Sequence, residues 1–460
     1  MPAERQRAIS TAHSYLSQGD YERKLSRLVA IPSESQLEHQ HSQLGFYCKE
    51  GVAPLFAEMG FKTQILDNAD NKGGPFVIAS RLEDPAKPTV LVYGHGDVVR
   101  GFENEWSDGR HPFTLSVSND CFYGRGVSDN KGQHLIAMEA ARAVLAVKGQ
   151  LNFNLKFLIE MGEEIGSPGL QEFLKSHKEL LAADVFIGVD GPRLNTTVPE
   201  LRLGGRGIIS FDLIVKLRDT AHHSGHWGGL LADPGFILAH ALASIVSPAG
   251  KVLVAGLTPQ AVPVSVSKAC RSLMIEETPN SPMPDSGWGE PNLTRSEKIF
   301  AWSSVVVLSF ITGHPDSPAN AVQPEARARL QVRHTADVAP EVIEPSLRRH
   351  LDQNGFENVL IASVERSSVF PPARTDPENP WVNRISASLE KTSGHAINIV
   401  PNSSGGNPSK FFMDGLGVPA IWIPNSYSGC RQHAPDEHIP VRLVREGLGN
   451  FAGLFWDLGS

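Results

Sequence analysis

Short apolar runs alternate with a helical pattern between about Phe76 and Asp190. The segment PTVLVYGH, bounded by Pro88 and Gly94, is typical of a buried strand. The segment HLIAMEAARAVLAVKG then places apolar residues at helical spacing and ends at Gly149. Two further segments, NFNLKFLIEMGEE and ADVFIGVDG, predict two more strands. This order of strand, helix and strand favours an α/β sheet that is covered on both faces.

The pattern of the chain changes after Gly204. GRGIISFDLIVKL and EARARLQVRH alternate apolar with polar positions, which is typical of antiparallel strands buried on one face. A helix is expected within HWGGLLADPGFILAHALASIV, which lies between them. The α/β pattern resumes near Trp381, with VPAIWIP as a strand and VRLVREGLGNFAGLFWDL as a closing helix. We therefore expect residues 206–375 to form an α+β domain inserted into an α/β domain made of residues 1–205 and 376–460.

The composition narrows the range of partners and compartments. A net charge of −8 and a pI near 6.1 argue against nucleic acid or an anionic membrane as a partner. The N-terminal segment MPAERQRAISTAHSYLSQGDYERKL lacks the apolar core of a signal peptide, and no apolar run approaches the ~20 residues that span a bilayer. The four scattered cysteines favour a reducing compartment. We therefore expect a cytoplasmic protein.

Polar residues gather at the ends of the predicted strands and at the start of the helix. These residues are His95, Asp97, Asp129, Glu163, Glu164 and Asp190. Each one alone fits a helix cap, a turn or a solvated pair. However, the carboxyl ends of parallel strands meet at one edge of a sheet, and carboxylates gathered there repel one another unless a cation neutralises them. Imidazole and carboxylate ligands together suit zinc or manganese.

Six fragments in this order resemble the M20 family of di-metal peptidases, and within it the dipeptidase branch that includes carnosine dipeptidases. The fragments are GHGDVV, GRGVSDNKG, MGEEIGSPGL, VDGP, HHSGHWGG and RQHAPDEHI. The resemblance extends over nearly the whole chain. It implies a zinc-peptidase-type α/β catalytic domain at residues 1–205 and 376–460 and an α+β lid and dimerisation domain at residues 206–375.

The resemblance also implies a pair of metal ions, with zinc as the first expectation and manganese or cobalt as alternatives. His95 and Asp190 would bind one metal, Glu164 and His433 would bind the other, and Asp129 would bridge them. Two such ions polarise a scissile carbonyl and acidify the water between them. The implied cofactor is therefore a dinuclear metal centre.

Three more residues would complete the catalytic set implied by the family. Asp97 would orient the neighbouring metal-bound histidine, and Glu163 would be the general base. His223 would reach into the active site of a second subunit and stabilise the oxyanion, which requires a two-fold dimer. His222 and His226 compete for this position, and the motif favours His223.

Substrate binding is implied at a further set of residues: Arg333, Asn320, Gly405, Gly406 and Asn407. Arg333 shares a strand face with Arg327 and Arg329, so a solvated basic face is an alternative explanation for it. The loop NSSGGNPSKFF lacks the arginine that close dipeptidases tend to carry before the two glycines, and Asn407 replaces the usual small hydroxyl residue. Both departures bear on how a substrate carboxylate is bound.

The type of ligand at Asp190 narrows the substrate class. In the family, aspartate at this position goes with dipeptidases and aminopeptidase-like members. We therefore expect a homodimeric di-metal hydrolase that cleaves the amide bond of a dipeptide or a related small amide. The alternatives are an M20-type deacylase or amidohydrolase acting on an N-acyl amino acid or another non-peptide amide, and a catalytically silent metal-binding protein. The expected partner is a small-molecule substrate, with no nucleic acid or membrane.

Overall fold

Two β-sheets organise the computed structural model, which describes residues 2–277, 281–365 and 370–460. The larger sheet has eight strands in the order β1-β2-β6-β3-β7-β19-β9-β18. In that order they are Lys62–Leu66, Phe76–Arg81, Asn154–Glu160, Thr89–His95, Val185–Gly188, Ala420–Trp422, Glu200–Arg202 and Asn398–Val400. The central strands β6, β3, β7 and β19 pair in parallel, whereas β1 and β2 add an antiparallel edge.

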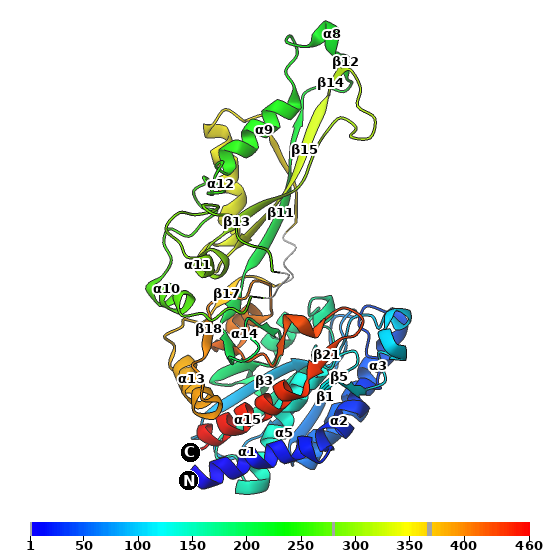
Figure 1. The fold of residues 1–460 in the computed structure, drawn as a ribbon, viewed down its shortest axis with the longest axis vertical. Helices are drawn as coiled ribbons and strands as arrows, with labels where there is room; N and C mark the ends of the chain where they lie inside the picture. The colour runs from blue at the N-terminus through cyan, green and yellow to red at the C-terminus, as the bar shows by residue number, and fades with distance from the viewer. Residues whose placement is uncertain (1, 278–280, 366–369) are drawn as a thin grey trace.

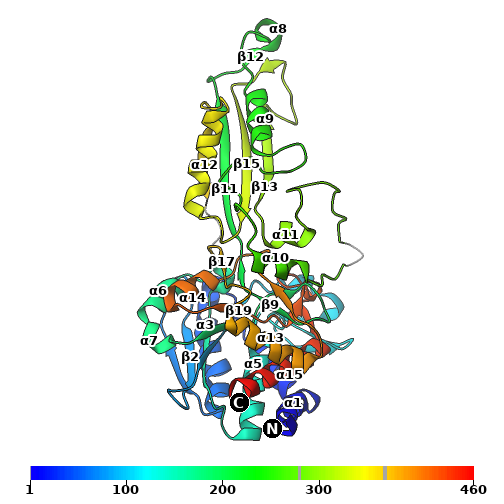
Figure 2. The same ribbon diagram turned by 90° about the vertical axis from the view of Figure 1, so that its left-hand side faces the viewer.

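Helices cover both faces of this sheet, as the apolar runs predict (Figure 2). Along β3, Val90 and Val92 face one core, whereas Leu91 and Tyr93 face the other. The first core is covered by α1 (Pro2–Ser17), α2 (Asp20–Val29), α3 (His41–Phe46), α4 (Ala53–Glu58), α5 (Lys131–Lys148), α13 (Pro380–Ser393) and α15 (Val441–Leu458). The second is covered by α6 (Leu170–Ser176), α7 (Lys178–Leu181) and α14 (Ser409–Leu416). The strands are therefore apolar on both sides because both sides are buried.

The N-terminal helix α1 and the C-terminal helix α15 pack against each other on one face of the larger sheet (Figure 1). Helix α15 lies against both α5 and α1. Arg5 of α1 forms an ion pair with Asp457 of α15 at 2.8 Å and also donates to Thr392 of α13. The closing helix is therefore part of the central packing of the sheet.

The smaller sheet is antiparallel and has the order β13-β15-β11-β16. Its strands are Ser304–Thr312, Glu325–His334, Gly207–Lys216 and Leu360–Glu365. Their buried positions pack on α9 (Pro234–Ile245) and α12 (Pro340–Gln353) and form a separate core. Helix α9 begins later than expected, because Asp233 caps it by accepting from the backbone of Gly235 at 2.8 Å.

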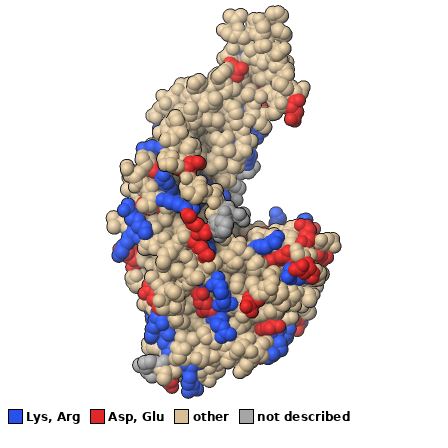
Figure 3. All heavy atoms as spheres, viewed as in Figure 1, with Lys and Arg blue, Asp and Glu red and all other residues tan. Residues whose placement is uncertain are grey.

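This smaller sheet extends away from the larger one as a long arm, and the surface is hollowed where the two meet (Figures 1 and 3). The far tip holds β12 (His222–His223), α8 (Ser224–Trp227) and β14 (Ala321–Val322). At its base, α10 (Val264–Arg271) and α11 (Arg295–Phe300) pack against Val400. Across the described ranges, no helix is both long enough and apolar enough to cross a membrane. The expected α/β domain with an inserted α+β domain is confirmed, whereas boundaries at 206 and 375 stay a prediction.

Candidate metal centre and substrate pocket

His95 is the last residue of β3 and is completely buried. Its Nδ1 lies 3.0 Å from the backbone oxygen of Asp97 and 3.3 Å from that residue's Oδ1. Its Nε2 faces Asp129 Oδ1 at 3.1 Å and Asp190 Oδ2 at 3.6 Å. Burial alone would lower the pKa of His95, but the three carboxylates raise it well above the usual value. A proton on Nδ1 donated to Asp97 leaves the Nε2 lone pair directed at the acidic cluster.

Asp129 occupies the centre of the cluster. Its Oδ1 faces His95, and its Oδ2 lies 3.1 Å from Nε2 of His433. Burial would raise the pKa of Asp129, but hydrogen bonds from the two imidazoles lower it instead. A carboxylate with one imidazole on each oxygen has the arrangement required of a bridging ligand.

The adjacent glutamates lie in a short turn, Glu163–Ile165, that follows β6. Backbone N–H groups of Glu163 and Glu164 donate to Oδ1 and Oδ2 of Asp97 at 3.2 and 3.1 Å. Glu164 Oε2 lies 3.0 Å from Nε2 of His433, whereas its buried Oε1 has no partner among the described residues. Burial, followed by the charge of Asp129, raises the pKa of Glu164 to about 7. Asp97 therefore holds both the histidine and the glutamate turn.

The histidine and carboxylate side chains of this cluster form a group that could bind divalent metal ions. Ligand atoms of His95, Asp129 and Glu164 all lie within 4.8 Å of one another. Asp190 and His433 contact the same cluster at 3.6 and 3.0 Å. The donors are imidazoles and carboxylates, the set that zinc and manganese accept. A cation would also bind the unpartnered Glu164 oxygen and offset the burial and carboxylate repulsion that raise the pKa values of both glutamates.

Glu437 lies in the fragment RQHAPDEHI but is not among the predicted site residues. It is fully buried, and its carboxylate accepts five hydrogen bonds of 2.8–3.0 Å. The donors are Arg125, the backbone of Gly126, the backbone and hydroxyl of Ser128, and the backbone of Asp129. Glu437 thus fixes the loop that presents Asp129. Its position four residues after His433 is the signal that could have drawn attention to it.

A pocket of about 260 Å³ opens beside this cluster. Its lining includes Glu163, Asp190 and the glycine-rich loop with Gly405 and Gly406. Asn407 also lines it, but its side-chain oxygen accepts from the Ser409 hydroxyl at 2.6 Å at the start of α14. The loop therefore presents mainly backbone groups to the pocket.

One of the three arginines on the strand face of β15 contacts this loop. Arg333 donates to the backbone oxygen of Ser404 at 3.1 Å, whereas Arg327 and Arg329 form ion pairs with the buried Asp212. The three arginines share a strand face, but Arg327 and Arg329 pair with Asp212 whereas Arg333 contacts the loop. The structure therefore separates Arg333 from its two neighbours.

Arg206 is a second basic residue that the sequence motifs do not identify. It is 7% exposed, and its side chain has no hydrogen-bond or ion-pair partner in the part of the chain that the structure describes. Burial, with the nearby guanidinium of Arg333, lowers the pKa of Arg206 to about 10. A buried, unpaired cation beside another cation favours the binding of an anion.

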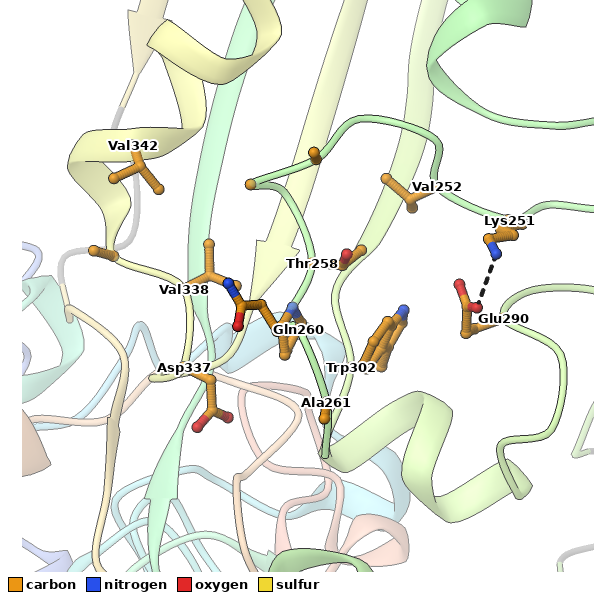
Figure 4. A pocket seen from close by; sticks show the side chains of 14 residues that line it. Lys251, Val252, Thr258, Gln260, Ala261, Glu290, Trp302, Asp337, Val338 and Val342 are labelled. Carbon is orange, nitrogen blue, oxygen red and sulfur yellow. Dashed lines mark ion pairs between the residues drawn. The ribbon is translucent and has the colours of Figure 1, made fainter. Parts of the chain in front are cut away.

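The structure does not bring His223 and Asn320 to the metal cluster of the same chain. Both lie at the tip of the arm, where the Asn320 carbonyl accepts from the backbone of Ser224 at 2.9 Å (Figure 1). His222 and His226 lie at the same tip. Farther down the arm, a cavity of about 930 Å³ is lined by Val252, Trp302 and Val338 among others, and by none of the predicted site residues (Figure 4).

A model of peptidase family M20/M25/M40 matches residues 91–456. The chain belongs to the M20 peptidase family. It is 27% identical to the Beta-Ala-His dipeptidase of Rattus norvegicus over 476 aligned residues, covering 97% of this chain and 94% of that protein. It is 30% identical to the Cys-Gly metallodipeptidase DUG1 of Candida albicans, covering 95% and 94%.

The fold agrees with this membership. The structure of human carnosine dipeptidase 1 superposes with a TM-score of 0.72 at 22% identity, covering 98% of each chain. The predicted family, fold class and enzyme class, an M20 metallopeptidase, are therefore confirmed.

Proposed function

We propose that this M20 peptidase hydrolyses dipeptides with a dinuclear metal centre. The observation that carries the proposal is the Asp129 carboxylate between the imidazoles of His95 and His433, with an unpartnered oxygen of Glu164 beside them. The names of the two relatives, both dipeptidases, support the substrate class. The catalytic domain of the proposal comprises residues 1–205 and 376–460, and residues 206–375 form the lid and dimerisation domain.

The proposed ligands divide between two metal positions. His95 and Asp190 hold one metal, Glu164 and His433 hold the other, and Asp129 bridges them. Zinc is the proposed metal, with manganese or cobalt as alternatives. When bound, the two ions polarise the scissile carbonyl and acidify the attacking water.

Glu163 is the proposed general base. Burial raises the pKa of its carboxylate well above the usual value, which favours uptake of a proton from water and its delivery to the leaving amine. Asp97 is a positioning residue, because it receives the backbone N–H groups of Glu163 and Glu164 and the ring of His95. One buried carboxylate thereby orients a ligand from β3 and the base that follows β6.

The carboxylate of the dipeptide is proposed to bind at Arg333, with the unpaired Arg206 and the backbone of Gly405 and Gly406. A planar guanidinium matches the two oxygens of a carboxylate. Arg333 already contacts the loop through Ser404. Gly405 and Gly406 line the same pocket as Glu163, so a carboxylate bound at this loop lies near the proposed base.

A homodimer is proposed to complete the site. Strand β13 is an edge strand of the smaller sheet, and Val306, Val307, Leu308, Phe310 and Ile311 on it are each 43–51% exposed. An exposed apolar edge favours pairing with a second copy. Such a dimer would place the arm tip, with His223 and Asn320, over the site of the other subunit. We propose a cytoplasmic location, in keeping with four free cysteines.

The function is tested with metal-stripped protein supplied with Zn²⁺, Mn²⁺ or Co²⁺. Dipeptides and N-acyl amino acids are offered in parallel, and a chelator is the control. Metal-dependent release of amino acids from dipeptides is expected. Hydrolysis of N-acyl amino acids alone would replace the proposal with a deacylase, and metal binding without hydrolysis of either class would refute an enzymatic role.

The dimer is tested by mixing two inactive variants, Glu163→Gln and His223→Ala. Each mixed dimer has one site with a native base and a native histidine from the other subunit. Random exchange of subunits then restores about a quarter of wild-type activity, because half of the dimers are mixed and each has one complete site. No recovery after verified subunit exchange would contradict a role of His223 in trans.

A further inference from the structure

Arg202 lines the pocket of about 260 Å³ that also contains Glu163 and Asp190. It is the last residue of β9 and is only 8% exposed. The pocket is lined by Glu163, Asp190, Gly191, Pro192, Arg202, Ser403, Ser404, Gly405, Gly406, Asn407 and Trp422. Among these lining residues Arg202 is the one cation. Glu163 and Asp190 have roles in the proposed chemistry, so Arg202 is the charged group left without one.

The guanidinium of Arg202 is held in one orientation. Its Nε donates to Glu200 Oε1 at 2.5 Å, its Nη1 donates to the Ser403 hydroxyl at 3.2 Å, and its Nη2 donates to the carbonyl of Pro192. Glu200 is fully buried, and its other oxygen accepts from the backbone of Leu194 at 2.8 Å. A guanidinium has five N–H donors. Three are engaged, which leaves one on each Nη.

The guanidinium of Arg202 lies close to Gly191, the residue that follows the predicted metal ligand Asp190. A Cβ placed on Gly191 would lie 3.5 Å from Nη1 of Arg202, so the guanidinium stands directly behind the residue that follows Asp190. Glu200 does not line the pocket. The negative charge that balances Arg202 is therefore on the buried side, and the pocket side presents the cation.

Two guanidinium groups flank consecutive residues of the same loop. Arg202 contacts the hydroxyl of Ser403, and Arg333 contacts the backbone oxygen of Ser404. Arg333 is proposed above to bind the terminal carboxylate of the dipeptide. A second positioned guanidinium then fits a second carboxylate on the same small molecule.

We propose that Arg202 is a specificity-determining residue that selects dipeptides with a side-chain carboxylate, that is, dipeptides containing aspartate or glutamate. This inference rests on the proposed dipeptidase function and deepens it. The acidic side chain occupies the pocket and receives the free N–H groups of Arg202. Glu200 is a positioning residue, because it holds the plane of the guanidinium.

The test compares substrates that differ only in a carboxylate or an amide. The pairs are Glu-Ala with Gln-Ala and Ala-Glu with Ala-Gln, and kcat/KM is measured for each. The wild-type enzyme is expected to prefer the glutamate member of one pair by roughly 10–100-fold, as for a lost charged hydrogen bond. The Arg202→Met variant is expected to lose this preference while it still cleaves the glutamine member.

Removing Arg202 leaves Glu200 buried without its partner, so a second variant is required. The double variant Glu200→Gln/Arg202→Met removes both charges and is expected to fold and to lose the preference equally. Arg193→Met is the matched control, because Arg193 is also buried but contacts Glu446 and the Pro424 carbonyl outside the pocket. It is expected to keep the wild-type ratio.

Binding supplies a readout that does not depend on turnover. Glu163→Gln protein is titrated calorimetrically with both members of each pair, with and without Arg202→Met. Tighter binding of the glutamate member that disappears with Arg202→Met supports the inference. Equal affinities and equal kcat/KM values for Glu and Gln dipeptides overturn it, while cleavage of both leaves the dipeptidase function standing. Absence of any dipeptide cleavage would refute the proposed function instead.

Discussion

Replacing Glu437 by glutamine tests whether one buried carboxylate organises the loop that carries Asp129, a proposed metal ligand. The two oxygens accept five hydrogen bonds: Oε1 three, from Ser128 and Asp129, and Oε2 two, from Arg125 and Gly126. An amide keeps one acceptor oxygen and turns an NH₂ group toward the other donors, so at least two bonds are lost. The buried guanidinium of Arg125 also loses its charged partner. Breaking a buried pair of this kind costs about 3–5 kcal/mol.

The free energy of unfolding of the metal-free Glu437→Gln variant should therefore fall by about 3–5 kcal/mol in urea titrations followed by tryptophan fluorescence. Metal affinity should fall by about 10–100-fold, because the loop presents Asp129. Asp414→Asn is the matched control: this carboxylate pairs with Lys410 on the surface, and its loss should cost less than about 1 kcal/mol. A Glu437→Gln variant within 1 kcal/mol of wild type, measured at the ~0.5 kcal/mol precision of such titrations, would refute the reasoning.

Three further changes have expected outcomes. Glu163→Gln should lower kcat by at least about 100-fold while metal content, measured by mass spectrometry, stays unchanged; normal turnover would exclude it as the base. Leu308→Lys, at an exposed position of β13, should shift the protein from dimer to monomer in light scattering and abolish activity. Burial, followed by the charges of His95 and Lys131, lowers the pKa of His134 to about 3, so folded His134 stays neutral where the unfolded residue takes a proton. Stability should therefore fall by up to about 1.4 kcal/mol per pH unit below pH 6.5, and His134→Gln should flatten this slope in urea titrations at pH 5–7.

The general architecture could be predicted from the sequence because its signals are local. Largely apolar strands such as Thr89–His95 indicate burial on both faces, and alternation in Glu325–His334 indicates burial on one. The same alternation in Gly207–Lys216 predicted one buried face, but Ser210 and Asp212 on its polar side are buried as well. The acidic and histidine residues at the strand ends were also visible, because each follows a recognisable strand. The structure brings them together, whereas their roles as ligands stay a prediction.

The residues that the sequence did not reveal act through distant partners. Glu437 accepts from the backbone of Asp129, which lies 308 residues earlier. Arg206 has no local motif, and its importance comes from burial without a partner beside Arg333. Arg202 resembles an ordinary strand residue until Ser403, 201 residues later, is placed against it. Such contacts depend on the completed fold and leave no periodic pattern in the chain.

The order of strands in the large sheet constrains how the nascent chain folds. The edge of β7 is covered only when β19 pairs Phe186 with Ala420, and Arg5 of α1 meets its ion-pair partner only when Asp457 has been synthesised. The four strands of the arm, in contrast, all lie between residues 207 and 365 and can pair as soon as they emerge from the ribosome. The arm can therefore complete its sheet while the catalytic domain still has an unpaired edge at β7, and unpaired strand edges favour aggregation.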